Sequence, residues 1–300
     1  LSMISLRQIT YALAVGRTLH FKQAADACAV SPSALSTAIT EMERQLGFTL
    51  FERDNKKVLV TTRGKEVLEK FHSIKLQVDD LDKLSYSGQE PLSYPLSIGI
   101  IPTIGPYLLP KVLPALNHKY PALQLTIIEE ESQVLLEMLR RGELDTAILA
   151  LPFRLDGLLS FTFWEEDFYW ITHRDDVQAN KSEVAASELD TSKLMLLKEG
   201  HCLKDHALAA CKLTQDAHHS FSSSSLYTLV QLVAGKMGTT LVPQMALGQL
   251  LAANDVLVKA HLNEPGPHRK IAFVTRPNYV GVDDLEALMA LFKQELANHT

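Results

Sequence analysis

The clearest hydrophobic pattern in the chain lies near its N-terminus. Leu35, Ile39, Met42 and Leu46 follow one another at steps of four, three and four, which places their side chains on one face of a helix. A good N-cap and a proline suited to the first helical position precede this stripe, and a glycine follows it. These three residues are Ser31, Pro32 and Gly47. The pattern therefore predicts a helix between that proline and that glycine.

Two further helices are expected upstream. Residues 6–16 carry apolar side chains partly on one face, and Phe21 to Cys28 forms a second helix in which Ala24 and Ala25 allow close packing. We interpret Cys28 as a packing residue. Two helices joined by a tight turn form a helix-turn-helix motif, whose second helix lies in the major groove of DNA.

The opposite face of the helix after Pro32 supports this interpretation. It carries only short hydroxyl side chains, which can approach base edges and phosphates. They are Ser33, Ser36, Thr37 and Thr40, and with Ser31 and Pro32 they are the expected DNA-binding residues of the helix. A merely solvated face is the alternative, but Ser and Thr do not favour helix interiors.

Residues 50–60 are expected to form a hairpin with its turn at Asp54–Asn55. Such a wing places Arg53, Lys56 and Lys57 at the phosphates. From Thr62 to about Ser87 the chain then predicts one long helix. Its apolar residues alternate steps of four and three, as in the seam of a coiled coil. They are Val67, Phe71, Ile74, Val78 and Leu81.

The remainder of the chain alternates strands and helices, which predicts a parallel sheet with covering helices. The expected elements are strands at 96–101, 123–129 and 146–151, helices at 105–119 and 133–141, a second α/β set at about 163–268, a strand at 271–275 and a helix at 282–298. Ligands of such sheets bind at the carboxyl ends of the strands. Thr103 and Ser132 follow the first two strands, and residues 222–225 precede a later helix.

Composition and charge restrict the class of protein and the kind of partner that we expect. Apolar residues make up 46% and charged residues 21% of 300 residues, as in soluble proteins with more than one domain. No apolar run is long enough to span a membrane and no signal peptide is visible, so we expect a cytoplasmic protein. The net charge is −6, yet residues 1–65 carry nine Lys/Arg against five Asp/Glu. A basic N-terminal module on an acidic body favours nucleic-acid binding by the first part alone.

Candidate redox chemistry lies in the segment Lys198–Cys211, which holds two of the three cysteines. Cys202 is expected in the first turn of a helix, where the dipole and nearby cations favour a thiolate. In a regular helix the Cα atoms of Cys202 and Cys211 are about 13 Å apart, whereas a disulfide needs about 7 Å or less. Closing that bond therefore requires the helix to unwind.

Two alternatives for this segment remain open at this point. The two cysteines can be unrelated free thiols, because Cys is a common buried residue. Metal binding is the other alternative, because histidines are frequent nearby, although their spacing matches no zinc-finger pattern. These histidines are His201, His206, His218 and His219.

A set of motif residues at fixed spacing extends from the second helix to the start of the long helix. It comprises Phe21, Ala24, Ala25, Ser31–Ser36, Ile39, Glu43, Leu46–Gly47, Leu50–Arg53, Thr61 and Gly64. In these positions residues 6–65 resemble the winged helix-turn-helix of LysR-type transcriptional regulators. The resemblance implies dimerisation through the long helix and a periplasmic-binding-protein-like effector domain of two lobes.

The expected division follows from this resemblance. It comprises a winged helix-turn-helix domain over residues 3–61, a linker helix and hinge over 62–90, and an α/β effector domain over 91–300, with lobe I at about 91–163 and 269–300 and lobe II at about 164–268.

The segments Ile98–Pro110 and Gly200–Cys211 make the chain similar, over residues 4–300, to the OxyR-type group of this family, which senses hydrogen peroxide. The resemblance implies that Cys202 reacts with peroxide to give a sulfenic acid, which condenses with Cys211. It also implies that Thr103, Ser132, His201 and Asp205 line the peroxide site. Ser132 stands where Thr is commoner and Lys204 where Arg is familiar, and both keep the functional group or charge.

The resemblance further implies double-stranded promoter DNA, RNA polymerase and a dimer of dimers as partners, with no metal, cofactor or membrane. The chain is then an activator of the oxidative-stress response and not an enzyme. A LysR-type regulator that binds a metabolite in the lobe cleft is the main rival, and it predicts charged groups for a carboxylate there. A thiol peroxidase is the second rival, but it leaves the helix-turn-helix unexplained.

Overall fold

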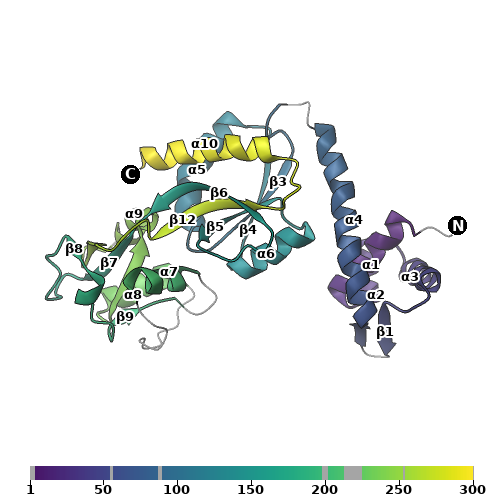
Figure 1. Ribbon diagram of the computed structural model, residues 1–300, viewed down its shortest axis with the longest axis horizontal. Coiled ribbons are helices and arrows are strands. Elements are labelled where there is room, and N and C mark those ends of the chain that lie inside the picture. The colour runs from purple at the N-terminus through teal and green to yellow at the C-terminus, as the bar shows by residue number, and fades with distance from the viewer. Residues whose placement is uncertain are drawn as a thin grey trace. The chain divides into compact units, whose positions relative to one another are not determined.

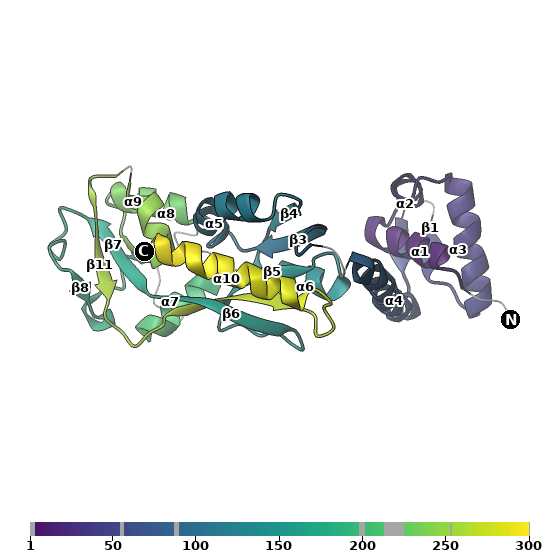
Figure 2. The ribbon, with the colours of Figure 1, turned by 90° about the horizontal axis from the view of Figure 1, so that it is seen from above.

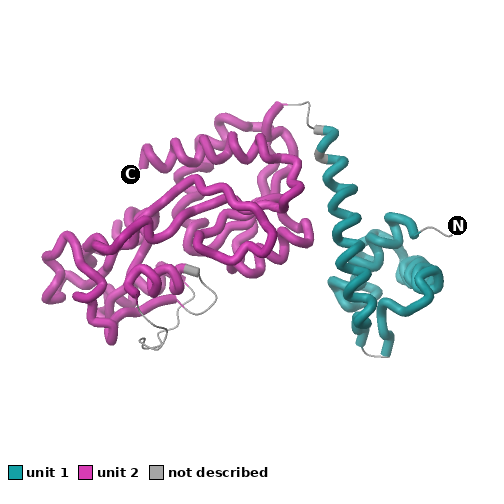
Figure 3. The backbone as a smooth tube through the Cα atoms, in the orientation of Figure 1, with its two compact units in different colours: residues 1–88 teal, residues 89–300 magenta. Residues whose placement is uncertain are grey.

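The computed structural model contains a small helical unit and a larger α/β unit (Figure 1). The two compact units comprise residues 1–88 and residues 89–300 (Figure 3). The structure describes residues 4–54, 57–86, 90–197, 202–212, 225–252 and 254–299, and of Lys83, Tyr86 and Cys202 it describes the backbone alone.

The first unit has the expected helix-turn-helix and wing. Its elements are α1 (Leu6–Thr18), α2 (Phe21–Ala27), α3 (Pro32–Leu46), β1 (Phe51–Asp54), β2 (Lys57–Val60) and α4 (Thr62–Tyr86). The start and end of α3 are as expected, because the Ser31 hydroxyl accepts from the Ala34 backbone N–H and Gly47 ends the helix at φ 77°. The predicted stripe is confirmed, since Leu35, Ile39 and Met42 are fully buried.

Small differences from the expectation occur at the ends of elements. The helix α1 continues to Thr18, and α2 ends at Ala27 with Cys28 as its C-cap. Asp54 is not part of the turn but is the last residue of β1, where it pairs with Lys57 in the antiparallel ladder. The expected turn residue Asn55 and the wing residue Lys56 lie outside the described residues.

The first sheet of the larger unit has the strand order β4-β3-β5-β12-β6. These strands are β3 (Pro95–Ile100), β4 (Gln124–Glu129), β5 (Thr146–Leu151), β6 (Leu159–Glu166) and β12 (Arg269–Thr275), and the covering helices are α5 (Gly105–Lys119), α6 (Ser132–Arg141) and α10 (Val282–Asn298). β3, β4 and β5 are parallel as predicted, but β12 is antiparallel to both its neighbours, so the sheet is mixed. α5 and α10 lie side by side on it (Figure 2).

The second sheet has the order β8-β11-β7-β10-β9. Its strands are β7 (Phe168–His173), β8 (Glu183–Val184), β9 (Leu194–Met195), β10 (Thr239–Pro243) and β11 (Leu257–Leu262), accompanied by η1 (Ala186–Glu188), α7 (Cys202–Cys211), α8 (Leu226–Ala234), η3 (Gln244–Ala246) and α9 (Leu247–Leu251). The chain passes between the sheets from β6 to β7 and from β11 to β12. The two sheets therefore form two lobes joined by two crossings, and the predicted fold class is confirmed.

Candidate functional site

The polar face of α3 is open in the first unit. Ser33, Thr37 and Thr40 are exposed, while Ser36 is half-buried. Arg53, on β1, lies against this face instead of extending from the wing. Its Nη1 donates to the Ser36 hydroxyl at 2.9 Å and its Nη2 to the Thr40 hydroxyl at 3.4 Å.

Other contacts fix Arg53 in this position. Its guanidinium carbon lies 4.3 Å from the centre of the Phe21 ring, and its Nη2 atom lies 3.6 Å from the Glu43 carboxylate. Glu43 in turn accepts the backbone N–H groups of Leu50 and Phe51. The hairpin and α3 are therefore joined by one network, which holds a cation beside the hydroxyl face.

Two substitutions on this surface are expected to have different effects on DNA binding. If Thr37 contacts a base, as the sequence predicts, Thr37→Ala should weaken operator binding by about 1–3 kcal/mol and leave non-specific binding unchanged. Lys57→Gln removes an exposed wing cation, so it should weaken both kinds of binding and reduce the salt slope by about 1. Fluorescence anisotropy across a salt series measures both effects. If Thr37→Ala weakens binding to operator and random DNA equally, a base-reading role for Thr37 is contradicted.

The helix α7 comprises Cys202–Cys211, so Cys202 lies in its first turn, as the sequence predicts, and Cys211 is its last residue. A regular helix of this length separates the two Cα atoms by about 13 Å, which is too far for a disulfide. Cys211 is only 5% exposed, and burial, with help from the Glu264 carboxylate, raises the pKa of its thiol to about 11. This thiol therefore stays protonated near neutral pH and is a poor direct nucleophile.

The buried face of α7 anchors it to the rest of the unit. Leu203, His206, Ala207 and Leu208 are each at most 5% exposed. The His206 Nε2–H donates to the backbone carbonyl of Pro152 at 2.9 Å, and Pro152 directly follows β5 of the other lobe. His206 Nδ1 is buried without a hydrogen-bond partner among the described residues. The neutral His206 side chain therefore links α7 to the first lobe through this hydrogen bond.

The burial of His206 predicts that the stability of the folded protein depends on pH. Burial is the main cause that lowers the pKa of His206 below 6.5, and the Arg269 cation also lowers it. Between the lowered value and 6.5 the unfolded chain binds more protons than the folded one. Stability from this group is therefore complete above pH 6.5 and is lost as pH falls through that range.

His206→Gln keeps a donor for Pro152 but cannot titrate there. We expect this variant to lose less stability than the parent protein between pH 7 and pH 5, measured by urea unfolding. His118→Gln, an exposed change on α5, is the matched control and should follow the parent. Identical pH profiles for His206→Gln and the parent protein rule out this contribution.

A buried ion pair connects the crossing strands at the lobe junction. Arg269, at the start of β12, is 1% exposed and donates through Nε to the Glu166 carboxylate at 2.7 Å. The other Glu166 oxygen accepts the Met245 backbone N–H at 2.7 Å. Arg269 also donates to the hydroxyl and the carbonyl of Thr103, at 3.4 Å and 3.3 Å. A fixed cation therefore lies against one of the residues expected to hold peroxide.

Thr103 and Ser132 lie at the carboxyl ends of two adjacent parallel strands, and each is 2% exposed. The possibility that they serve as helix caps is not supported, because the N-caps of α5 and α6 are Ile104 and Glu131. The Thr103 hydroxyl accepts from Arg269, and its own hydrogen has no acceptor among the described residues. That hydrogen is therefore available to donate to a ligand.

The other expected site residues are described only in part. Asp205 is exposed on α7, whereas His201 and the side chain of Cys202 lie outside the described residues. His218 and His219, from the metal alternative, lie outside them too. Within the described part of the chain, no group of three or more His, Cys, Asp or Glu side chains could hold a metal ion. None of its helices has both the length and the apolar character of a membrane span.

A cleft of about 500 Å³ opens beside Thr103, between the first lobe and the N-terminus of α8. Its acidic lining residues are Glu129, Glu130 and Glu131, and its hydroxyl-bearing ones are Thr103, Tyr107, Ser225 and Tyr227. Burial raises the pKa of Tyr107 to about 12, so its phenol remains a donor. Of the residues that the structure describes, no Lys, Arg or His lines the cleft, which makes it a poor host for a carboxylate.

The sequence analysis did not identify Arg269 or Glu166, and it named His206 only as a possible metal ligand. One weak signal for the ion pair is in the sequence, namely the two cations, Arg269 and Lys270, that precede the apolar part of β12. The acidic lining of the cleft was not predicted either; Glu129 ends β4, and Glu130 and Glu131 follow it. Both features depend on long-range packing between the lobes, which local patterns do not specify.

The comparisons with known proteins agree with this architecture. Residues 6–65 match the model of the bacterial regulatory helix-turn-helix proteins of the lysR family, and residues 89–297 match the LysR substrate binding domain. Together these models cover most of the chain, which therefore belongs to the LysR family of DNA-binding transcriptional regulators.

Individual relatives refine the comparison. The chain is 37% identical to the HTH-type transcriptional regulator EstR of Acinetobacter baylyi, over 97% of this chain and 96% of EstR. It is 36% identical to the hydrogen peroxide-inducible genes activator of Dickeya chrysanthemi, over 91% of this chain and 90% of that protein.

Solved structures add a further likeness. A full-length OxyR variant from Pseudomonas aeruginosa superposes with a TM-score of 0.82 at 30% identity, covering 98% of this chain and 96% of that one. An OxyR variant from Corynebacterium glutamicum with bound H₂O₂ gives 0.68 at 29% identity, covering 99% and 94%. The sequence resemblance to OxyR-type regulators is confirmed.

Proposed function

We propose that this protein is a hydrogen-peroxide-sensing transcriptional regulator, switched by a reversible disulfide between Cys202 and Cys211. The observation that carries the proposal is the placement of these two cysteines at opposite ends of one regular helix, α7. A disulfide between them requires α7 to refold, so oxidation is coupled to a change of structure. Relatives at 34–36% identity that are named hydrogen peroxide-inducible genes activators support the same assignment.

The chemistry proceeds in two balanced steps. The Cys202 thiolate attacks one oxygen of H₂O₂, the O–O bond breaks, and hydroxide leaves to give a sulfenic acid. The Cys211 thiol then attacks the Cys202 sulfur, forming the S–S bond and releasing water. The raised pKa of Cys211 suits a resolving thiol that reacts only after α7 opens.

The surrounding groups act on charge and hydrogen bonding. The N-terminus of α7, where Cys202 lies, favours negative charge on a thiolate. The hydroxyls of Thr103 and Ser132, the imidazole of His201 and the carboxylate of Asp205 are proposed to bind the peroxide. Thr103 fits this role because its oxygen accepts from Arg269, while its hydrogen has no acceptor in the part of the chain that the structure describes.

Packing and hydrogen-bond contacts stabilise α7 against unwinding. Burial of Leu203 and Leu208 stabilises α7 by roughly 1.5–3 kcal/mol each, and the His206–Pro152 hydrogen bond adds about 1 kcal/mol. The disulfide must offset these losses, and its reduction lets the helix re-form. A reversible switch follows from this balance.

The first unit is the part of the protein that we propose binds DNA. We propose that Ser31, Pro32, Ser33, Ser36, Thr37 and Thr40 of α3, with Arg53 and Lys57 of the wing, contact double-stranded promoter DNA. Of the predicted seam of α4, Ile74 and Leu81 expose their side chains, as does the neighbouring Leu84, whereas Phe71 is buried in the core of its own unit. We propose that the exposed residues form the dimer contact. Assembly as a dimer of dimers, contact with RNA polymerase and a cytoplasmic location complete the proposal.

The likeness to EstR keeps a metabolite-responsive regulator as the alternative function. That rival predicts cationic groups in the cleft beside Thr103, whereas Glu129, Glu130 and Glu131 line it. The cleft therefore disfavours an anionic metabolite and accommodates a small neutral molecule such as H₂O₂. A thiol peroxidase is also disfavoured, because it leaves the DNA-binding fold without a role.

DNA capture tests the proposal as a whole. Full-length protein is incubated with sheared genomic DNA of its host, and the bound fragments are sequenced and footprinted with and without peroxide. We expect a small set of enriched sites whose footprints change in length after peroxide. Absence of enriched sites contradicts the regulator, and an unchanged footprint contradicts the peroxide switch.

A further inference from the structure

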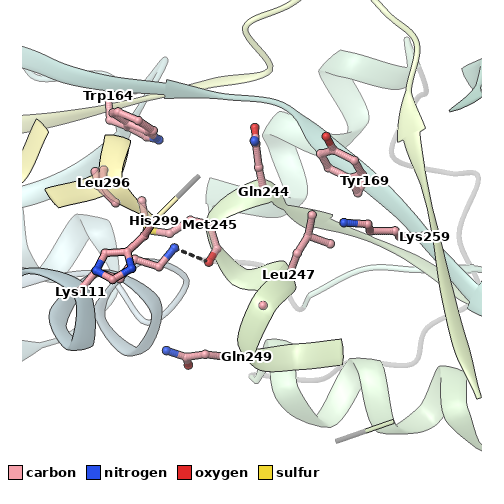
Figure 4. A pocket seen from close by; sticks show the side chains of 11 residues that line it. Lys111, Trp164, Tyr169, Gln244, Met245, Leu247, Gln249, Lys259, Leu296 and His299 are labelled. Carbon is pink, nitrogen blue, oxygen red and sulfur yellow. Dashed lines mark hydrogen bonds between the residues drawn. The ribbon is translucent and has the colours of Figure 1, made fainter. Parts of the chain in front are cut away.

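Lys111 and Arg53 each make hydrogen bonds that the proposed peroxide switch does not use. Lys111 of α5 donates through Nζ to the Met245 carbonyl at 3.3 Å, beside a hollow of about 450 Å³ (Figure 4). Its partner is a backbone atom of the effector unit, so this contact belongs to the packing of that unit. Arg53 of β1 differs, because its partners are the hydroxyls of Ser36 and Thr40 on the polar face of α3.

The Arg53 guanidinium is held in place within the first unit itself. Its central carbon lies 4.3 Å from the centre of the Phe21 ring, and its Nη2 atom lies 3.6 Å from the Glu43 carboxylate, whose side chain is only 10% exposed. Phe21 in turn meets the Phe51 ring edge-on. A guanidinium held by a ring, a carboxylate and two hydroxyls keeps one orientation, so its hydroxyl partners are pre-organised for binding.

The two hydroxyls bonded to Arg53 keep their own hydrogens unused. Arg53 donates through Nη1 to the Ser36 oxygen at 2.9 Å and through Nη2 to the Thr40 oxygen at 3.4 Å. Helical Ser and Thr hydroxyls can donate to the carbonyl four positions back, as Thr10 and Thr18 do in α1. Within the part of the chain that the structure describes, the hydroxyls of Ser36 and Thr40 donate to no acceptor. Their hydrogens are therefore available to a ligand.

A cation bonded to a hydroxyl oxygen restricts how that hydroxyl acts. The positive charge polarises the O–H bond, which strengthens the hydroxyl as a donor, and it repels the N–H groups of an approaching ligand. In the major groove, guanine presents acceptors at N7 and O6, adenine at N7 and thymine at O4, whereas cytosine and adenine present amino donors. Ser36 and Thr40 are therefore suited to the acceptor atoms of bases and not to the amino groups.

We propose that Arg53 is a positioning residue for DNA recognition, which fixes the hydroxyls of Ser36 and Thr40 as hydrogen-bond donors to base acceptors in the major groove. Arg53 then acts on sequence preference through these hydroxyls, beyond any attraction of its charge to phosphates. Ser36 and Thr40 are four residues apart, about 6 Å along the axis of α3, so they present two donors on one face of the helix. The inference rests on the proposed contact between α3 and promoter DNA.

Arg53→Lys tests this inference, because lysine keeps the positive charge but lacks the fixed fork of donors that a guanidinium provides. Full-length reduced protein is titrated by fluorescence anisotropy with a captured genomic site and with random DNA across a salt series. We expect specific binding to weaken by roughly tenfold or more, with non-specific binding and the salt slope unchanged. Arg63→Lys is the matched control and should behave as the parent protein. The Arg63 guanidinium also lies over a ring, that of Phe48, but it bonds to no α3 hydroxyl among the described residues.

Thr40→Val gives a second test in protein that retains Arg53. It removes the hydroxyl at nearly constant shape from an exposed position, so the fold should be preserved. Its loss of specific binding should not add to the loss caused by Arg53→Lys, because both changes disable the same donor. Base analogues that lack one acceptor, namely 7-deazapurines, 6-thioguanine and 4-thiothymine, should weaken the parent protein at a position where Thr40→Val protein is unaffected. Removal of the adenine amino group should cause no such difference.

Each measurement has a result that overturns the proposal. For Arg53→Lys it is parent-like specific binding, or an equal loss of specific and non-specific binding. For the controls it is an equal loss in Arg63→Lys, or additive losses in the double variant. For the analogues it is a difference that arises only when the amino group is removed, or no difference at all. Absence of specific binding by the parent protein instead contradicts the proposed regulator itself, so the two failures are distinguishable.

Discussion

Cys202→Ser is expected to abolish the peroxide response completely while leaving DNA binding by the reduced protein intact. A serine hydroxyl is not a nucleophile toward peroxide at neutral pH, and Cys211 cannot replace it because burial raises the pKa of that thiol to about 11. Footprints of this variant should be identical before and after peroxide.

The other two cysteines provide matched controls for this result. Cys211→Ser should still react once and then retain a sulfenic acid, which adds one oxygen to the mass, because the resolving thiol is missing. Cys28→Ser should behave as the parent protein, since Cys28 caps α2 in the other unit and burial raises the pKa of its thiol. A normal footprint change in Cys202→Ser contradicts the assigned role of this cysteine.

Arg269→Met is expected to cause the largest loss of stability of any single change discussed. Arg269 and Glu166 both have fully buried side chains, so removal of one partner leaves an unpaired buried charge. Breaking such a pair costs about 3–5 kcal/mol of unfolding free energy. Urea denaturation followed by circular dichroism measures this loss.

The adjacent residue is the control for Arg269. Lys270 pairs with Glu165 on the surface, where both side chains are about half exposed, so Lys270→Met should change stability by at most about 1 kcal/mol. The double variant Arg269→Met with Glu166→Gln should recover part of the loss, because no unpaired charge remains. Equal losses for Lys270→Met and Arg269→Met contradict this account of the lobe junction.

Much of the fold could be predicted from local patterns. The α3 helix was predictable because Ser31, Pro32 and Gly47 mark its ends and a stripe of buried residues fixes its inner face. α5, β5 and α10 likewise have the predicted bounds. β5 was recognisable as a short, continuous apolar run. The mixed character of the first sheet was not predictable, because strand direction depends on which strand returns from the second lobe.

The candidate site, like the fold, could be predicted from the sequence only in part. The two cysteines and the position of α7 were visible in the sequence, because helix-forming residues follow Gly200 without a break. The Arg269–Glu166 pair was not visible, because its partners are 103 positions apart and meet only at the lobe junction. The hydrogen bond between His206 and Pro152 could not be predicted for the same reason, because the two residues are 54 positions apart.

The central claim is that hydrogen peroxide joins Cys202 to Cys211 and thereby dismantles α7. A pulse of one equivalent of peroxide on the fully reduced protein, followed by intact mass measurement and peptide mapping, tests it most directly. We predict a loss of about 2 Da within seconds, located in a cross-link between the peptides that contain Cys202 and Cys211. If both thiols are still free after the pulse, or if the cross-link includes Cys28, the claim is wrong.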